Sequence, residues 1–210
     1  MHTKIPAVAL TFDDGPHPYF TPRVLDILST YDARATFFMI GKRARQYPHL
    51  VKKVAKAGHS IGNHSWDHQP FIGLNSKERK GQIHACKKAL YPYGEMIFRP
   101  PKGYQNYASR IDVFFLKYTV ITWSLHVDDW KNRTAKAMMH KLTSSCRPGS
   151  IILLHDAVWD PEFEGVENRT SMLEALEEFL QRVHARFQFI TVPELLKLGR
   201  PQRRSWIKYP

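Results

Sequence analysis

The length, composition and charge of the chain exclude several classes of protein. Its 210 residues are 43% hydrophobic, which is enough to bury one large core, and α/β barrels of this size form single domains. The formal net charge is +12, so we expect attraction to anionic surfaces, but no nucleic-acid reading motif accompanies the charge and we expect no nucleic-acid partner. No apolar run approaches the roughly 20 residues that span a bilayer, and the N-terminus has no signal-peptide pattern. Composition leaves the compartment and the oligomeric state open.

Short apolar segments and longer segments of helical period alternate along the chain. The short ones are rich in β-branched and aromatic residues and predict strands at residues 7–12, 35–40, 60–63, 96–99, 119–123, 151–154 and 188–191. The longer ones predict helices at residues 21–31, 49–57, 76–90, 108–115, 134–146 and 171–186, with a short helix at 194–198. This alternation predicts an α/β fold with a parallel sheet, and about seven strands favour a distorted or incomplete (β/α) barrel. We expect one domain over residues 1–199 and a basic C-terminal tail over residues 200–210.

The residues best suited to chemistry follow the predicted strands directly. In parallel barrels the carboxyl ends of all strands meet on one face, so side chains that are distant in sequence converge there. The residues that we expect on this face are Asp13, Asp14, His64, His68, Arg99, Asp128, Asp129 and His155.

Two pairs within this set have the spacing of metal ligands or of a catalytic base. His64 and His68 are four residues apart, which allows both imidazoles to reach one ion. Asp13 and Asp14 are adjacent at a strand end and precede a Gly-Pro turn, so one carboxylate can bind a metal while the other stays free as a base. An acidic pair alone is more typical of a turn or a helix cap. Two histidines and one carboxylate together leave coordination positions open, as a hydrolytic metal requires.

Five short motifs occur in order along the chain, at residues 11–16 (TFDDGP), 62–68 (GNHSWDH), 99–103 (RPPKG), 123–130 (WSLHVDDW) and 153–156 (LLHD). In content and order this set resembles the polysaccharide deacetylases of carbohydrate esterase family four, over residues 7–195. The family fold is a distorted (β/α) barrel, in agreement with the strand count. The resemblance implies a hydrolase that removes N-acetyl groups from an N-acetylglucosamine-containing glycan, of the chitin-oligomer or peptidoglycan type.

The resemblance implies a metal centre and a base. Asp14, His64 and His68 would bind one divalent metal ion, expected to be zinc, with cobalt or a similar ion as the alternative. Asp13 would be the general base that takes a proton from the attacking water. Arg99 would pair with Asp13 and hold it ionised.

The resemblance also implies an acid and a substrate slot. His155 would protonate the leaving amine, and Asp129 would orient His155 and keep it cationic. The backbone N–H of Lys102 would help to stabilise the oxyanion. Trp130 and Leu153 would form the apolar slot for the acetyl methyl group.

Two positions depart from the family pattern. Lys102 stands where the third motif usually has an aromatic residue, which spares the backbone N–H but alters the groove wall in favour of an anionic substrate. His126 stands where the fourth motif usually begins with an aspartate. Which residues surround the general acid His155 is therefore left undecided, and the neighbouring Asp128 is one candidate to replace the missing aspartate. Outside the motifs, Cys86 and Cys146 are either two buried thiols or one disulfide.

Three other functions fit parts of the pattern. A catalytically inactive glycan-binding protein on this fold is expected to have lost the base, a metal ligand or the acid, and this chain retains all of them. Phosphatases that form an aspartyl phosphate also carry acidic residues at a strand end, but with one residue between them, whereas Asp13 and Asp14 are adjacent. An amidohydrolase acting on a small cyclic amide without a metal is disfavoured by the intact set of Asp14, His64 and His68.

Overall fold

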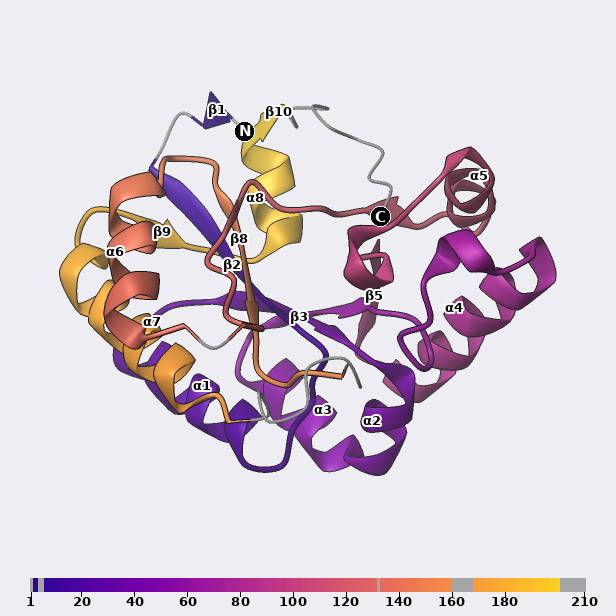
Figure 1. The fold of residues 1–210 in the computed structure, drawn as a ribbon, viewed down its shortest axis with the longest axis horizontal. Coiled ribbons are helices and arrows are strands. Elements are labelled where there is room, and N and C mark those ends of the chain that lie inside the picture. The colour runs from indigo at the N-terminus through magenta and orange to yellow at the C-terminus, as the bar shows by residue number, and fades with distance from the viewer. Residues whose placement is uncertain (1, 4–5, 132, 160–167, 201–210) are drawn as a thin grey trace.

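The computed structural model describes residues 2–3, 6–131, 133–159 and 168–200. A curved parallel sheet runs through the middle of the molecule and helices flank it (Figure 1). Its strands are β2 (Ala7–Asp13), β3 (Ala35–Met39), β4 (Ser60–Asn63), β5 (Gly94–Phe98), β6 (Thr119–Val120), β7 (Leu125–His126), β8 (Ile151–His155) and β9 (Gln188–Phe189). A separate antiparallel ladder joins β1 (His2–Thr3) to β10 (Gly199–Arg200).

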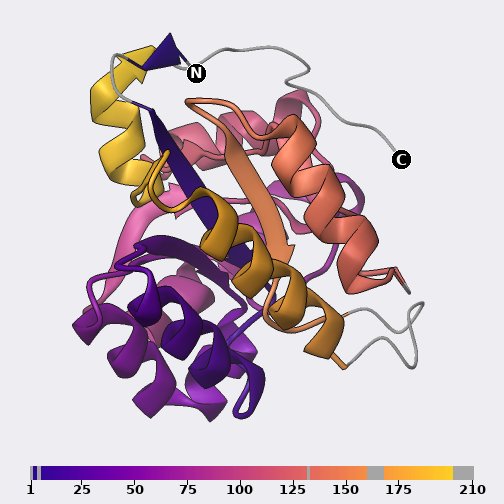
Figure 2. The same cartoon turned by 90° about the vertical axis from the view of Figure 1, so that its left-hand side faces the viewer.

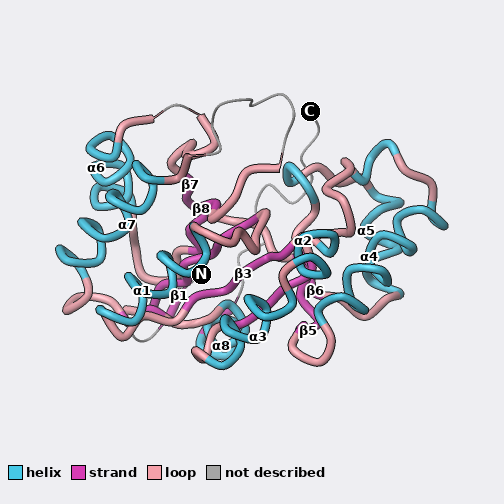
Figure 3. The backbone as a smooth tube through the Cα atoms, turned by 90° about the horizontal axis from the view of Figure 1, so that it is seen from below, coloured by secondary structure: helices cyan, strands magenta, loops and turns pink. Residues whose placement is uncertain are grey.

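The strand order makes this sheet an incomplete barrel. Hydrogen-bonded neighbours follow the order β6-β5-β4-β3-β2-β8-β7, and each of these pairs is parallel. The first two residues of β2 pair with β9, and its remaining residues pair with β8. Because β6 and β7 stand at opposite ends of the order, the barrel is open between them, and the strands form one curved band in Figure 3. The predicted fold class is confirmed.

Helices connect most of the strands. They are α1 (Phe20–Thr30), α2 (Gly41–Gln46), α3 (Pro48–Lys56), α4 (Ser76–Leu90), α5 (Tyr107–Phe115), α6 (Ala135–Ser145), α7 (Thr170–Val183) and α8 (Val192–Leu198). Asn75 before α4, Asn106 before α5 and Thr191 before α8 each accept a hydrogen bond from the backbone N–H three residues further on. Such caps satisfy the first N–H groups of a helix, which is why the sequence locates these helix starts closely.

The central strand β2 is buried on both faces. Val8, Leu10 and Phe12 belong to the large apolar core, whereas Ala7 and Ala9 belong to a second, smaller core to which α8 contributes. Helices α6 and α7 pack against each other and cover the sheet on the side of β2 and β8 (Figure 2). A continuous apolar run buried on both sides is typical of a parallel strand.

Local interactions explain where the predicted elements differ from the structure. The strand predicted at residues 119–123 pairs with β5 only at its first two residues, and the carbonyl groups of Ile121 and Thr122 accept hydrogen bonds from the side chain of Arg99. The strand predicted at residues 188–191 ends at residue 189, because Thr191 caps α8. The sequence does not predict β7, which has two residues, or α2, which begins after Ile40 without a side-chain cap.

The remaining expectations concern the cysteines, the tail and the membrane. Cys86 and Cys146 are two buried free thiols, and burial raises the pKa of Cys86 to about 12. Of the predicted basic tail, Arg200 belongs to β10 and is the register partner of His2 in the antiparallel ladder with β1. Residues 201–210 lie outside the described residues. Within the described ranges, no helix combines the length and the apolar character needed to cross a bilayer.

Candidate metal centre and active site

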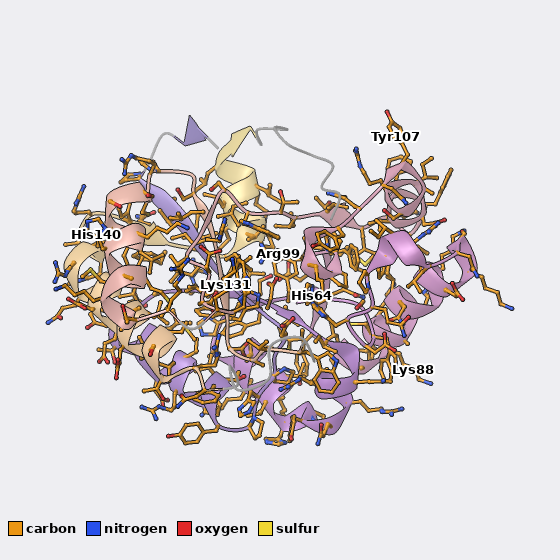
Figure 4. All side chains as sticks on the ribbon, in the orientation of Figure 1. His64, Lys88, Arg99, Tyr107, Lys131 and His140 are labelled. Atoms are coloured by element: carbon orange, nitrogen blue, oxygen red, sulfur yellow. The ribbon has the colours of Figure 1, made fainter. Side chains whose placement is uncertain are left out.

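The carboxyl ends of the strands bring the expected site residues onto one face of the barrel. Asp13 ends β2 and His155 ends β8, and the two are register partners in the sheet. His64 directly follows β4, Arg99 directly follows β5, and Asp129 lies shortly after β7. Figure 4 shows His64 and Arg99 near the middle of the molecule, among side chains from several strands.

Three side chains converge on one point of this face. The Oδ1 atom of Asp14 lies 3.3 Å from Nε2 of His64 and 3.3 Å from Nε2 of His68. One ligand atom from each residue falls within 4.8 Å of the others. All three side chains are almost fully shielded from solvent. Two imidazoles and one carboxylate in this arrangement suit a divalent transition metal and leave further coordination positions for water or substrate.

The hydrogen bonds around these three residues fit a bound cation. Among the described residues, no group donates a hydrogen bond to the buried Oδ1 of Asp14, and a buried carboxylate oxygen without a partner is costly. His64 donates its Nδ1–H to the carbonyl oxygen of Arg99 over 2.8 Å, which orients the ring with Nε2 towards Asp14. Burial lowers the pKa of His68 and favours the neutral imidazole that binds metals.

The backbone at two of these residues adopts the left-handed conformation. Asp14 has a φ of 72° and His68 a φ of 64°, a region that disfavours residues other than glycine by about 1–2 kcal/mol. Local contacts hold both: Asp14 Oδ2 accepts the backbone N–H of Trp159 over 3.1 Å, and the N–H of His68 donates to Ser65 Oγ over 3.0 Å. Strain of this kind concentrates at functional sites, where it aims side chains.

A buried arginine holds the second carboxylate. Arg99 Nη1 donates to Asp13 Oδ1 over 2.7 Å and to Thr11 Oγ1 over 2.8 Å. Arg99 is fully buried, and its guanidinium lies over the ring of Phe38. The other oxygen of Asp13, Oδ2, lies 3.8 Å from His64 Nε2, so it faces the candidate ligand set.

His155, the register partner of Asp13, is paired with a buried carboxylate. Asp129 Oδ1 lies 3.0 Å from Nδ1 of His155, and Asp129 Oδ2 accepts the backbone N–H of His155 over 2.8 Å. Burial lowers the pKa of His155, but the charge and the hydrogen bond of Asp129 outweigh burial and raise it to about 9. His155 is therefore cationic at neutral pH and can donate a proton from Nε2.

These groups surround one cavity of about 220 Å³. Asp13, Asp14, His64, His68, Lys102, Trp130, Leu153 and His155 line it, together with Gly103, Tyr104, Trp123 and Val158. Arg99 and Asp129 stand behind this lining, each bonded to a residue that belongs to it. The cavity thus joins carboxylates, imidazoles and an apolar wall in one space.

Arg169 is a further residue of the site, and sequence reasoning missed it. Its Nη1 donates to the backbone carbonyl of Asp129 over 2.6 Å and lies 3.7 Å from Oδ2 of the same residue. Arg169 is buried at the start of α7. Nothing in the local sequence marks it, because it lies outside the five motifs and meets Asp129 only in the folded chain.

The structure also shows what surrounds the two positions that depart from the family pattern. His126 stacks on the ring of Trp130 with a centroid distance of 5.4 Å, and its Nδ1 lies 3.4 Å from Asp128 Oδ1. Asp128 is further bound by Lys141. The carboxylate that is hydrogen-bonded to His155 belongs to Asp129 and not to Asp128. Lys102 has a φ of 55° and borders the cavity.

Comparisons with known proteins agree with this fold. Residues 1–121 match the family described as polysaccharide deacetylase. A peptidoglycan-N-acetylglucosamine deacetylase of Bacillus cereus is 37% identical over 195 residues, which cover 90% of this chain and 88% of the relative. A chitooligosaccharide deacetylase of Azorhizobium caulinodans is 36% identical over 165 residues, which cover 73% of this chain and 79% of the relative.

A solved structure supports the same assignment. The peptidoglycan deacetylase PdaC from Bacillus subtilis has a TM-score of 0.82 to this chain at 32% identity, over 94% of this chain and 93% of that one. Together with these relatives, the incomplete (β/α) barrel and the histidine-carboxylate cavity at its carboxyl face place the molecule among the hydrolases. The chain belongs to the polysaccharide deacetylase family, and the predicted resemblance to that family is confirmed.

Proposed function

We propose that the chain is a metal-dependent hydrolase that removes N-acetyl groups from an N-acetylglucosamine-containing glycan of the peptidoglycan or chitin-oligomer type. One observation carries the proposal: the arginine-paired Asp13 and the aspartate-paired His155 border the same cavity as Asp14, His64 and His68. Amide hydrolysis needs a base for the attacking water and an acid for the leaving nitrogen, and this cavity offers a candidate for each.

Asp14, His64 and His68 are the residues that would hold the metal ion, for which zinc is expected and cobalt is the alternative. Such an ion supplies Lewis-acid polarisation of the acetamide carbonyl. The chain contributes the position: the Nδ1–H of His64 is fixed on a carbonyl oxygen, and Asp14 is fixed through its other oxygen by the N–H of Trp159. These contacts preorganise the donor atoms before an ion arrives.

Asp13 is the general base in this proposal. Arg99 occupies its Oδ1, so Oδ2 is the oxygen that faces the cavity and takes the proton from the attacking water. The buried guanidinium lies 2.7 Å from Oδ1 and balances the charge of the Asp13 carboxylate. Because Arg99 is also bonded to Thr11 and to carbonyl groups of the chain after β6, it cannot follow a moving Asp13, and the base stays in one orientation.

His155 is the general acid. It donates its Nε2 proton to the nitrogen of the acetamide as the carbon–nitrogen bond breaks, which releases acetate and leaves a free amine on the sugar. Asp129 stabilises the imidazolium through Nδ1. Arg169 neutralises part of the charge of Asp129 and fixes its backbone, so it acts as a positioning residue behind the acid.

Three further residues shape the acetyl end of the cavity. The backbone N–H of Lys102 would stabilise the developing oxyanion, for which its left-handed conformation supplies a fixed direction. Trp130 and Leu153 line the cavity beside His155 and would receive the acetyl methyl group. The ring of Trp130 is held between His126 and His155, with centroid distances of 5.4 and 5.3 Å.

The proposed substrate class follows from the relatives, two of which are named for peptidoglycan and for chitooligosaccharides. We infer that Lys102, which replaces an aromatic wall residue, favours glycans with a negative charge near the reacting sugar, as in peptidoglycan with its carboxylates. A neutral chitin oligomer would then be the weaker substrate.

A substrate panel tests this function. Purified protein supplied with zinc is incubated with N-acetylglucosamine oligomers, peptidoglycan fragments and acetylated xylan, and acetate and new free amines are quantified. We expect equal amounts of acetate and amine from at least one N-acetylated glycan. His155→Gln should retain glycan binding and lose acetate release, because the acid is removed. Binding of the glycans by the unaltered chain without any acetate release would instead identify an inactive glycan-binding protein and refute the proposal.

A further inference from the structure

One side of α5 exposes a cluster of large apolar side chains. Tyr107, Ile111, Phe114 and Phe115 are 73%, 51%, 74% and 71% exposed. Their spacing in the helix puts them on one side of it. The rings of Phe114 and Phe115 meet edge to face, with centroids 5.8 Å apart, and Figure 4 shows Tyr107 pointing away from the body of the molecule. Clustered apolar side chains in contact with water mark an interaction surface.

The buried side of α5 holds the helix in this orientation. Val113 packs in an apolar cluster with Phe98 and Tyr118. Asp112 accepts a hydrogen bond from Arg79 Nε of α4 over 2.7 Å. The exposed cluster is therefore the outer side of a firmly anchored helix and does not result from a loosely packed segment.

The charged residues around the exposed cluster are mostly basic. Asp112 is the acidic residue of α5, and it is buried and paired, so it does not reach the outer side. Arg110 lies within the helix at the flank of the cluster, and Lys117 follows two residues after its end. Helix α4, which packs against α5, carries exposed Lys87 and Lys88 near its end and exposed Glu78 near its start, so basic residues outnumber acidic ones on the two helices.

This combination matches an anionic lipid surface. Aromatic and aliphatic side chains on one side of a helix enter the boundary between headgroups and acyl chains, while neighbouring lysines and arginines bind headgroup phosphates. A second copy of the chain is a poorer occupant, because each copy carries a net charge of +12 and the two would repel. We propose that the outer side of α5 docks on a lipid bilayer that contains anionic headgroups. The proposal is independent of the proposed function.

Vesicle sedimentation tests the proposal. The full chain is mixed with vesicles of phosphatidylcholine alone, or of phosphatidylcholine with phosphatidylglycerol, at low and at physiological salt. We expect binding to the anionic vesicles that persists at physiological salt, and little binding to phosphatidylcholine. Phe114→Ser/Phe115→Ser should weaken binding by about tenfold or more, because two anchors leave the bilayer. Tyr91→Ser is the matched control, because Tyr91 is 82% exposed outside α5, and it should bind as the unaltered chain does.

Three outcomes would overturn the proposal. Equal binding by the double phenylalanine variant would mean that net charge alone attracts the chain to anionic vesicles. Failure of the unaltered chain to bind the anionic vesicles would refute docking on lipid. A concentration-dependent dimer in analytical ultracentrifugation that the double variant abolishes would assign the surface to self-association instead. Thermal unfolding of each variant, compared with the unaltered chain, ensures that lost binding does not reflect lost folding.

Discussion

Asp129 holds His155 at two points, with Oδ1 3.0 Å from the imidazole Nδ1 and Oδ2 accepting the backbone N–H over 2.8 Å. One carboxylate thus fixes both the charge and the direction of the imidazole. The ring lies at the end of β8 and lines the same cavity as the candidate metal ligands.

This pair predicts a pH dependence. Burial lowers the pKa of His155, but the charge and hydrogen bond of Asp129, helped by the charges of Asp14 and Asp13, outweigh it and raise the pKa from 6.5 to about 9. The acid form therefore persists through neutral pH, and we expect turnover to fall as the pH rises through about 9. Asp129→Asn should move this alkaline limb to lower pH, towards 6.5, and reduce turnover at neutral pH. The measurement is a pH profile of acetate release for both proteins. An unshifted limb in the variant would contradict the pairing.

The same shift affects folding. A group whose pKa is higher in the folded than in the unfolded chain stabilises the fold fully below the unfolded value and loses this contribution as the pH rises through the folded value. We therefore expect the extra stability from His155 to be complete below about pH 6.5 and to disappear through about pH 9. Urea unfolding of chelator-treated protein across this range, compared with Asp129→Asn, measures the contribution.

Arg169 should matter although it does not border the cavity. Arg169→Met removes the side-chain donor to the buried carbonyl of Asp129 and the cation 3.7 Å from its carboxylate. We expect this loss to cost about 1–3 kcal/mol and to lower turnover more than it changes KM. Arg182→Met is the matched control, because Arg182 of α7 also pairs with a carboxylate, that of Glu178, but both side chains are exposed. This variant should change stability by less than about 0.5 kcal/mol. If the two variants behave alike in unfolding and turnover, Arg169 is not a positioning residue.

One substitution distinguishes the role of Asp13 as a base from the role of the metal ligands. Asp13→Asn preserves the shape of the side chain and an oxygen for Arg99, so we expect metal binding to persist while turnover falls by about 10²–10⁴-fold. Metal content and thermal unfolding are measured on the same sample, so that a folding defect is recognised. Near-normal turnover in this variant would show that another group is the base.

Gly15 tests how tightly the turn after the two aspartates is packed. A Cβ at this position would lie 2.4 Å from Oδ2 of the buried Asp156, which also accepts a hydrogen bond from Thr21. We expect Gly15→Ala to destabilise the fold by about 1–3 kcal/mol. Gly81→Ala is the control, because open space surrounds position 81 on α4, and alanine should stabilise the helix by about 0.5–1 kcal/mol. Equal melting temperatures for the two variants would refute this packing.

Much of the fold was predictable because strong local signals agree with it. The apolar run of β2 and the helix caps at Asn75 and Thr191 specify elements without long-range information. The family membership was predictable because the motifs are contiguous in sequence and follow strand ends.

The remaining features depend on contacts between distant residues. The chain after Val120 leaves the ladder where Arg99 binds its carbonyl groups, and no local pattern encodes that contact. The link between Arg169 and Asp129 spans 40 residues of sequence. The backbone N–H of Trp159, which holds Asp14, carries no sequence signal because every residue except proline has one.

The measurement that tests the central claim most directly is metal-dependent acetate release. Protein stripped with a chelator is assayed on an N-acetylglucosamine oligomer or a peptidoglycan fragment, then supplied with zinc or cobalt, alongside His68→Ala. We predict that stripping abolishes release, that either ion restores it in the unaltered chain, and that His68→Ala binds zinc more weakly and recovers far less. Undiminished release from the stripped protein would contradict a metal centre at Asp14, His64 and His68.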